Sequence, residues 1–456
     1  MIQTVRKAWG IPELRKKLIF TAMILLIFRF GNAIPVPFVN TDLLKNWLES
    51  MSTTVLGLYN VMSGGALSAA TIFALGVQPY INSSIIIQLL TIAIPALERL
   101  ARDGGEAGKK KIASITRYAT VAIALLQGFG YYMIMKNNGI LLQQGFWPAV
   151  VIIISFVAGS AFVMWLGEQV NEFGVGNGIS IILFAGILSR VPTGISNIIS
   201  GMDQWKQIKG GSITVDSLVS AGYTTERAEQ YINSALAPWA VPLLLIGILA
   251  MIVLIVHVSG AERRIPVQYA KRQVGRKMYG GQASTLPMKV NMSGVLPVIF
   301  AQSIAALPAT IAAFMPAPEK GTFAYAFLQA IDTKSVVYLI AYFLMIIGFS
   351  YFYATIQFNP VEISNNLKRN GGFIPGFRPG KPTSDFIAKV LSKVTLFGAI
   401  YLGIVAIAPL IVGKALGNSA LAIGGTSVII VVGVALETVQ ALESQMMMRQ
   451  YKGFLE

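Results

Sequence analysis

Residues 60–96 read NVMSGGALSAATIFALGVQPYINSSIIIQLLTIAIPA, an apolar stretch that is interrupted near its middle. The first part, 60–75, is rich in Gly, Ser and Ala and is too short to cross a bilayer, which needs about 20 helical residues. Gly76 and Pro79 open a second part, 76–96, which is long enough. Irregular backbone at membrane depth is tolerated only inside protein or beside a water-filled cavity. Residues 60–75 therefore form either an amphipathic helix on the outer membrane surface or a short re-entrant helix that caps a cavity.

The rest of the chain is similarly apolar. Of the 456 residues, 54% are hydrophobic and 12% are charged, about half the charged share of a soluble domain. We predict an all-α polytopic membrane protein with ten transmembrane helices. No small-residue cleavage site follows the first apolar run, so we interpret that run as a retained span. The predicted spans are 18–38, 76–96, 116–135, 147–167, 179–199, 239–258, 291–315, 335–357, 386–412 and 420–440.

Lysine and arginine are distributed unevenly between the two sides of these spans. The N-terminus, the gaps after the second, sixth and eighth spans and the C-terminal tail hold 26 of the 36. The opposite side holds nine, and Arg29 lies inside the first span. Because cytoplasmic loops carry the excess of basic residues, we predict that both termini are cytoplasmic.

The composition argues against several kinds of chemistry. The chain has no cysteine and one histidine, His257, so it has no disulfide framework, no thiol nucleophile and no Cys- or His-cluster metal site. GGEAGKKK, residues 104–111, lacks the first Gly and the Ser/Thr of a phosphate-binding loop. Carboxylates are scattered rather than grouped. We therefore predict no metal, no cofactor and no enzymatic activity.

The predicted membrane interior is nearly free of charge. Ion-coupled transporters usually keep carboxylates or bases on their pathway, whereas here Arg29 is the main interior charge. A secondary transporter or lipid-linked flippase remains the alternative function. Uncharged polar residues concentrate in the second and seventh spans. They either form hydrogen bonds that hold helices together or line a contact between the two helices that water can enter.

Two predicted cytoplasmic gaps, 259–290 and 358–385, are unusually long. Both combine basic residues with Gly, Pro and aromatic residues. Solvated loops that only orient the protein would explain the charge. Their length also suits the docking of an acidic or RNA partner.

Six motifs along the chain resemble the SecY family of bacterial protein-conducting channels. The likeness runs from the first span to the last in the family's order. The motifs are SGGALSAATIFALGVQPYINSSIIIQLLT (63–91), MWLGEQVNEFGVGNGISIILFAGI (164–187), RRIPVQYAKRQVGR (263–276), LPMKVNMSGVLPVIFAQSI (286–304), FNPVEISNNLKRNGGFIPGFRPG (358–380) and GGTSVIIVVGVALE (424–437).

This resemblance implies a single channel domain over residues 1–456 built from two pseudo-symmetric, inverted halves, 1–200 with spans one to five and 239–456 with spans six to ten. It places a plug at about 60–75 on the outer side of an apolar constriction. The expected plug residues are Ser63, Gly64, Gly65, Ala66, Leu67, Ser68, Ala69 and Ala70. The expected ring residues are Val77, Ile81, Ile179, Leu183, Ile299 and Ile430, with Val77 and Leu183 in place of the usual isoleucines.

The resemblance also implies a lateral gate, through which apolar segments of a translocating polypeptide reach the lipid. It implies the small membrane subunits SecE and SecG, the motor ATPase SecA and the ribosome as partners, signal sequences and unfolded polypeptides as substrates, and a multi-pass location in the cytoplasmic (inner) membrane. The gate residues are Gln78, Asn82, Gln88, Asn291 and Gln302. The docking residues for SecA or the ribosome are Arg263, Arg264, Lys271, Arg272, Arg276, Lys277 and Arg378.

Overall fold

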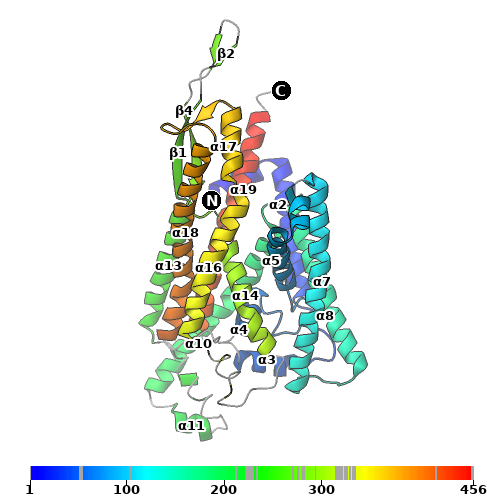
Figure 1. Ribbon diagram of the computed structural model, residues 1–456. Helices are drawn as coiled ribbons and strands as arrows, with labels where there is room; N and C mark the ends of the chain where they lie inside the picture. The colour runs from blue at the N-terminus through cyan, green and yellow to red at the C-terminus, as the bar shows by residue number, and fades with distance from the viewer. Residues whose placement is uncertain are drawn as a thin grey trace.

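The computed structural model shows a bundle of long helices with a small β-sheet at one end (Figure 1). It describes residues 2–50, 55–102, 104–210, 213–220, 228, 231–232, 235, 237–269, 272–274, 277–279, 283–292, 294–313, 322, 327, 330, 335–415 and 419–452.

A helix lies at each of the ten predicted spans. The helices at these positions, in chain order, are α2 (Pro12–Gly31), α5 (Gln78–Ala93), α7 (Gly105–Asn137), α8 (Phe146–Phe173), α9 (Gly178–Leu188) with α10 (Val191–Lys209), α13 (Ala240–Ser259), α14 (Leu296–Ala313), α16 (Val336–Gln357), α18 (Lys381–Ala415) and α19 (Ser419–Lys452). The shorter helices are α1 (Ile2–Trp9), α3 (Thr41–Ser50), α4 (Val55–Met62), α6 (Pro95–Arg102), α11 (Val215–Ser220) and α17 (Pro360–Arg369).

Not all of the helices at the predicted spans are long and apolar enough by themselves to be identified as membrane spans. Within the described residues, seven helical segments are long and apolar enough to cross a membrane, or eight if the bent pair α5 and α6 forms one span. The remaining two predicted spans correspond to α2, whose ends carry basic residues, and to α14, whose apolar part Leu296–Pro308 is shorter. The prediction of an all-α polytopic membrane protein is confirmed.

Proline explains where two helices differ from their predicted bounds. We expected the first span to reach residue 38, but α2 ends at Gly31, shortly before Pro35 and Pro37, which lack the N–H that a helix interior requires. The second span ends in a bend of 105° between α5 and α6, at Pro95. The expected bounds of these two spans are therefore wrong at their C-terminal ends.

The gap 259–290, expected to be a loop, contains a β-hairpin. Strands β1 (Glu262–Tyr269) and β4 (Ala283–Lys289) pair antiparallel from Glu262↔Lys289 to Gln268↔Ala283. Strand β5 (Gly372–Phe373), in the other long gap, pairs with β1 at Gln268 and Tyr269, so the sheet order is β4-β1-β5. Ile265 and Val267 point to one side of β1 and are buried against Ile387 of α18. A second hairpin, β2 (Arg272–Val274) with β3 (Lys277–Tyr279), extends beyond the sheet.

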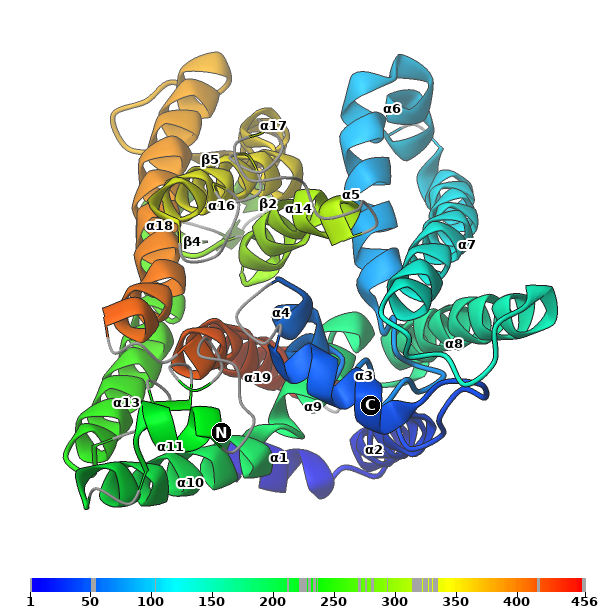
Figure 2. The same cartoon turned by 90° about the horizontal axis from the view of Figure 1, so that it is seen from below.

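The helices form two groups that touch at several places. α2, α5, α7, α8 and α9 pack together, as do α13, α14, α16, α18 and α19. The groups meet where α5 contacts α14, where α9 contacts α19, and where Lys17 of α2 donates a hydrogen bond to Gln445 of α19 at 3.4 Å. The helix α4 lies between them and contacts α9, α14 and α19 (Figure 2). The sheet, α17 and the C-terminal end of α19 lie at one end of the bundle, and α3, α10 and α11 lie at the other (Figure 1).

Candidate functional site

The segment between α4 and α5, residues 63–77, is a compact loop that we call the plug loop. It contains all eight predicted plug residues, but it is a series of turns, and the short helix expected at 60–75 begins earlier, as α4 at Val55–Met62. Gly64 and Gly65 explain the end of α4, because their φ angles of +70° and +88° lie in the left-handed region.

Asn60, in the last turn of α4, holds the plug loop together. Its carbonyl oxygen accepts hydrogen bonds from the backbone N–H of Gly65 at 2.8 Å and from Ser63 Oγ at 3.1 Å. Its Oδ1 accepts one from the Ser68 backbone N–H at 3.0 Å. Asn60 is not among the residues predicted from the sequence. The available signal was an Asn shortly before a Gly-Gly pair, which is typical of a turn.

The plug loop is fitted closely against three helices. A Cβ added at Gly159 of α8 would overlap the Ile72 carbonyl oxygen, and one added at Gly31 of α2 would overlap the Phe73 ring. Ser160 Oγ of α8 donates a hydrogen bond to the Gly76 carbonyl at 3.2 Å. On α9, the Gly186 carbonyl oxygen would lie 3.0 Å from a Cβ added at Gly64 of the loop. These contacts fix the loop against the first group of helices.

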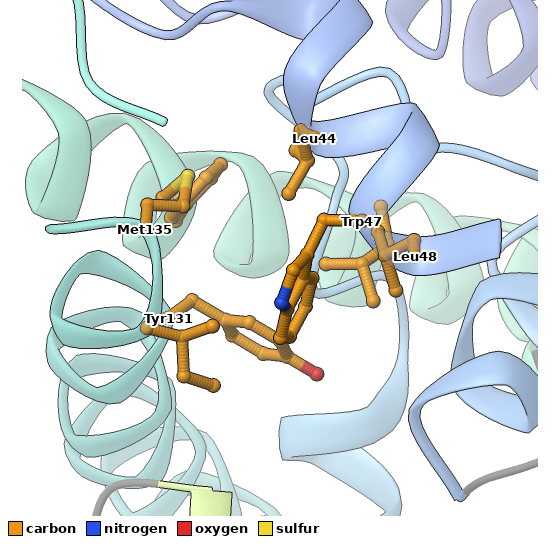
Figure 3. A pocket seen from close by; sticks show the side chains of 8 residues that line it. Leu44, Trp47, Leu48, Tyr131 and Met135 are labelled. Atoms are coloured by element: carbon orange, nitrogen blue, oxygen red, sulfur yellow. The ribbon is translucent and has the colours of Figure 1, made fainter. Parts of the chain in front are cut away.

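A small apolar cavity lies beside the plug loop (Figure 3). Leu67 reaches it from the loop, and α3 and α7 form most of its remaining wall. Leu67 is only 4% exposed, so the loop is held there by apolar packing as well as by hydrogen bonds. The lining residues are Leu44, Trp47 and Leu48 of α3, Leu67, Tyr131, Ile134 and Met135 of α7, and Phe156 of α8.

The structure brings the six predicted ring residues into one hydrophobic cluster. They come from the end of the plug loop and from four helices, α5, α9, α14 and α19, that belong to both helix groups. Each is at most 9% exposed. The six are Val77, Ile81, Ile179, Leu183, Ile299 and Ile430, and the cluster also contains many other buried residues of both helix groups.

The helices α5 and α14 contact each other, and we call this contact, together with the buried polar residues of the two helices, the seam. Within the described residues, Gln78 Oε1 and Asn82 Nδ2 on α5 have no hydrogen-bond partner, and neither does Gln302 Oε1 on α14. The neighbouring Ser303 Oγ is in the same condition. Gln78 Nε2 makes only a long contact of 3.9 Å with Met62 Sδ. A buried polar group without a partner costs about 1–3 kcal/mol, so the seam is a costly contact for the protein.

Of the other two predicted gate residues, Gln88 lies on a seam helix and Asn291 does not. Gln88 lies on α5, where its Nε2 donates to Ser84 Oγ at 3.3 Å and its Oε1 has no partner among the described residues. Asn291 does not lie on α14, which begins at Leu296. It lies in the linker that follows β4, with its Cα 3.8 Å from a Cβ added at Gly398 of α18.

The β-sheet brings the described docking residues to one end of the bundle. Arg263 and Arg264 are exposed on β1, and Arg264 Nε lies 3.6 Å from Glu262 Oε2. Arg378 is exposed in the loop between β5 and α18, and no salt bridge to it is found in the described part of the chain. Lys271 and Arg276 lie outside the described residues, and for Arg272 and Lys277 only the backbone, in β2 and β3, is described.

The loop that carries Arg378 is well ordered by its own contacts. Thr383 Oγ1 donates to the Arg378 carbonyl at 2.8 Å, and Ser364 Oγ of α17 donates to the Gly380 carbonyl at 2.7 Å. The rings of Phe377 and Phe386 lie 4.2 Å apart. The Arg378 guanidinium therefore extends from a surface turn that these contacts hold in place.

Comparison with known proteins places this arrangement in a family. The SecY family model matches residues 71–439. The chain belongs to the SecY family. It is 39% identical over 468 residues to the protein translocase subunit SecY of Streptomyces scabiei, with 100% of both chains covered. SecY is a family of protein-conducting channels and not of enzymes, so this chain is a protein-conducting channel subunit.

Solved structures agree with the family assignment at the level of the fold. One described as a protein conducting channel matches with a TM-score of 0.61 and 18% identity, covering 94% of this chain and 92% of the other. Sec61 in a canine ribosome-channel complex from the endoplasmic reticulum matches with a TM-score of 0.56 and 16% identity over the same shares.

Proposed function

We propose that an unfolded polypeptide crosses the membrane through the apolar ring of this SecY chain after displacing the plug loop. The observation that carries this proposal is the convergence of the six ring residues, from both helix groups, in one buried cluster. The helix α4 and the plug loop pack beside this cluster, between α9, α14 and α19. A path that opens between the two groups passes through the ring.

The apolar character of the ring suits a channel that carries many sequences. Aliphatic side chains form no specific hydrogen bonds with a passing chain. A narrow apolar constriction also resists water and ions because it dewets. The ring therefore seals the closed channel and tolerates diverse substrates.

We propose the seam between α5 and α14 as the lateral gate to the lipid. Its unpartnered polar atoms make the closed contact costly. A signal sequence that separates the two helices shifts the equilibrium toward the open state by its differential affinity for that state. Apolar segments of the substrate then leave sideways between the two helices.

Energy for movement comes from partners in this proposal, because the sequence carries no phosphate-binding loop motif. Arg263 and Arg264 on β1, together with Arg378, offer a basic surface to SecA or to the ribosome. The helix α13 is nearly all exposed within the chain, with 6% of its apolar window buried. It offers an apolar face to lipid and to single-span subunits such as SecE and SecG.

We place the chain in the cytoplasmic membrane with the sheet end and both termini inside, following the excess of basic residues at that end. The chain has no cysteine, so single cysteines test this orientation. Lys368→Cys on α17 should be protected from an impermeant thiol reagent added to intact cells, and Leu142→Cys, at the opposite end, should be labelled. The reverse labelling pattern would overturn the orientation.

The channel function is tested by reconstitution. The chain is incorporated into vesicles with SecE, and SecA, ATP and a precursor protein are added. We expect the precursor to become protected from protease only when ATP is present. A precursor that stays sensitive, in vesicles where the complex has assembled, would contradict the proposed function.

A further inference from the structure

One face of α19 holds the linker that connects the β-sheet to the gate helix α14. This linker spans residues 290–295, of which 293 lies outside the described residues, and it follows Lys289, the last residue of β4. Gly433, Glu437 and Gln440 follow one another at spacings of four and three, which puts them on one face of α19. Gln440 Oε1 accepts a hydrogen bond from Lys289 Nζ at 2.6 Å. At the other end of the linker, a Cβ added at Gly433 would overlap the Val295 side chain.

Glu437 caps the N-terminus of α14 from outside that helix. Its carboxylate accepts a hydrogen bond from the Val295 backbone N–H. The Val295 carbonyl accepts from the N–H groups of Val298 at 3.1 Å and Ile299 at 3.3 Å, so Val295 is the cap residue. In many helices an acidic residue in the first turn accepts the cap N–H. α14 has none there, and Glu437 supplies the acceptor instead.

Gly294 fits this arrangement for two reasons. Its φ of +62° lies in the left-handed region, which glycine adopts readily. A Cβ at this position would also overlap Glu437 Oε1. The backbone therefore approaches the carboxylate more closely than any other residue type allows.

The cap fixes the position of the functional face of α14. Val295, Ile299 and Gln302 follow at spacings of four and three and so share one face of that helix. Ile299 is a ring residue and Gln302 is a seam residue. A shift or rotation of α14 at Val295 would move both from their places.

We propose that Glu437 is a positioning residue for the channel: it holds α14 on α19 in the register that closes both the ring and the seam. This inference rests on the proposed roles of the ring and the seam. Losing the cap should weaken the closed state selectively, so that the channel discriminates less between precursors with functional and with defective signal sequences. A general loss of stability would instead lower the translocation of both precursors alike.

The first experiment measures the ratio of translocation rates for these two precursors in the reconstituted complex. Glu437→Ala should lower this ratio about tenfold, the effect expected for a lost hydrogen bond to a charged group. Gly294→Ala, which displaces the carboxylate, should do the same. Glu437→Gln keeps an oxygen acceptor and should retain most of the ratio. An unchanged ratio in Glu437→Ala, or a Gln variant as impaired as the Ala variant, would overturn the proposal.

A reversible cross-link gives the decisive control. A Cβ at Gly433 lies 3.4 Å from Val295 Cβ, close to the separation of about 3.5–4.5 Å found in disulfides. Val295→Cys with Gly433→Cys, placed in the Glu437→Ala chain, should regain the ratio when oxidised and lose it when reduced. Failure of the oxidised form to regain discrimination would refute positioning by the cap. If the wild-type chain translocates neither precursor, the proposed channel function fails instead.

Discussion

Leu67→Ala should make the closed channel leak ions. Leu67 belongs to the plug loop and is 4% exposed, and its side chain lines the cavity whose wall is formed mainly by α3 and α7. Replacing a buried Leu by Ala costs about 2–5 kcal/mol, and the cost depends on how completely the side chain is packed. Because Leu67 already borders a small cavity, we expect a value near the low end, about 2 kcal/mol.

This cost falls mainly on the closed state, since a displaced plug loop has left the cavity. At about 1.4 kcal/mol for each factor of ten, a loss of about 2 kcal/mol raises the population of displaced plug about thirtyfold. While the closed state still dominates, resting conductance should rise in proportion. The measurement is the ion conductance of the reconstituted complex in a planar bilayer without precursor or motor.

Leu67→Met is the matched control. Methionine is apolar and of similar volume, and such exchanges usually cost less than about 1.5 kcal/mol, so its conductance should stay near that of the unaltered channel. The reasoning would be refuted if Leu67→Ala translocated precursor normally and showed no increase in resting conductance.

Further substitutions address the ring, the seam and the docking surface. Replacing both Ile81 and Ile299 with Ser should wet the ring and raise resting conductance, whereas replacing both with Leu should not. Equal conductance for the two double variants would mean that these residues are ordinary packing residues of the helix core. Gln302→Leu removes an unpartnered buried oxygen, so it should stabilise the closed seam by about 1–3 kcal/mol and slow translocation of precursors with weak signal sequences; a faster rate would contradict this. Arg378→Glu should abolish motor-driven translocation without affecting assembly, and Arg378→Lys should restore it only in part, because an ammonium cannot copy bidentate contacts; normal translocation by the Glu variant would show that this charge only helps to orient the chain.

The long helices could be predicted from sequence because each membrane span must meet its structural requirements within its own residues. A span must satisfy its own backbone hydrogen bonds and remain apolar over about 20 residues, and both properties are visible in the sequence alone. The pattern also allowed the interruption after Asn60 to be located. It did not give the conformation there, because Gly64 and Gly65 end α4 and the following turns depend on contacts with Gly159 and Gly186 in distant helices.

The β-hairpin was missed although part of its signal was present. Arg264, Ile265, Pro266 and Val267 alternate between exposed and buried positions, the period expected of a strand with one buried face. Proline and basic residues made the segment resemble a loop. Pro266 is tolerated because β5 pairs with β1 only at its last two residues, which leaves the rest of that edge of β1 open.

Glu437 illustrates what no local pattern could have predicted. In the sequence it is one acidic residue near the end of the last span, and its role follows only from the approach of Gly294 and Val295 to α19. Capping boxes can be recognised from sequence because their two residues are three positions apart. A cap supplied by another helix leaves no such spacing.

The proposed gate at the seam relates its buried polar atoms to opening by a signal sequence. Shifting a two-state equilibrium from about 1:99 to about 99:1 requires about 5.5 kcal/mol of differential affinity. Gln78, Asn82 and Gln302 each bury a polar atom without a partner in the closed contact, at about 1–3 kcal/mol each. These atoms raise the free energy of the closed contact, so the closed state is less strongly favoured than it would be with an apolar seam, and the signal sequence must supply correspondingly less differential affinity. The plug loop and the ring, which are closely packed and apolar, then keep the closed state favoured until a substrate arrives.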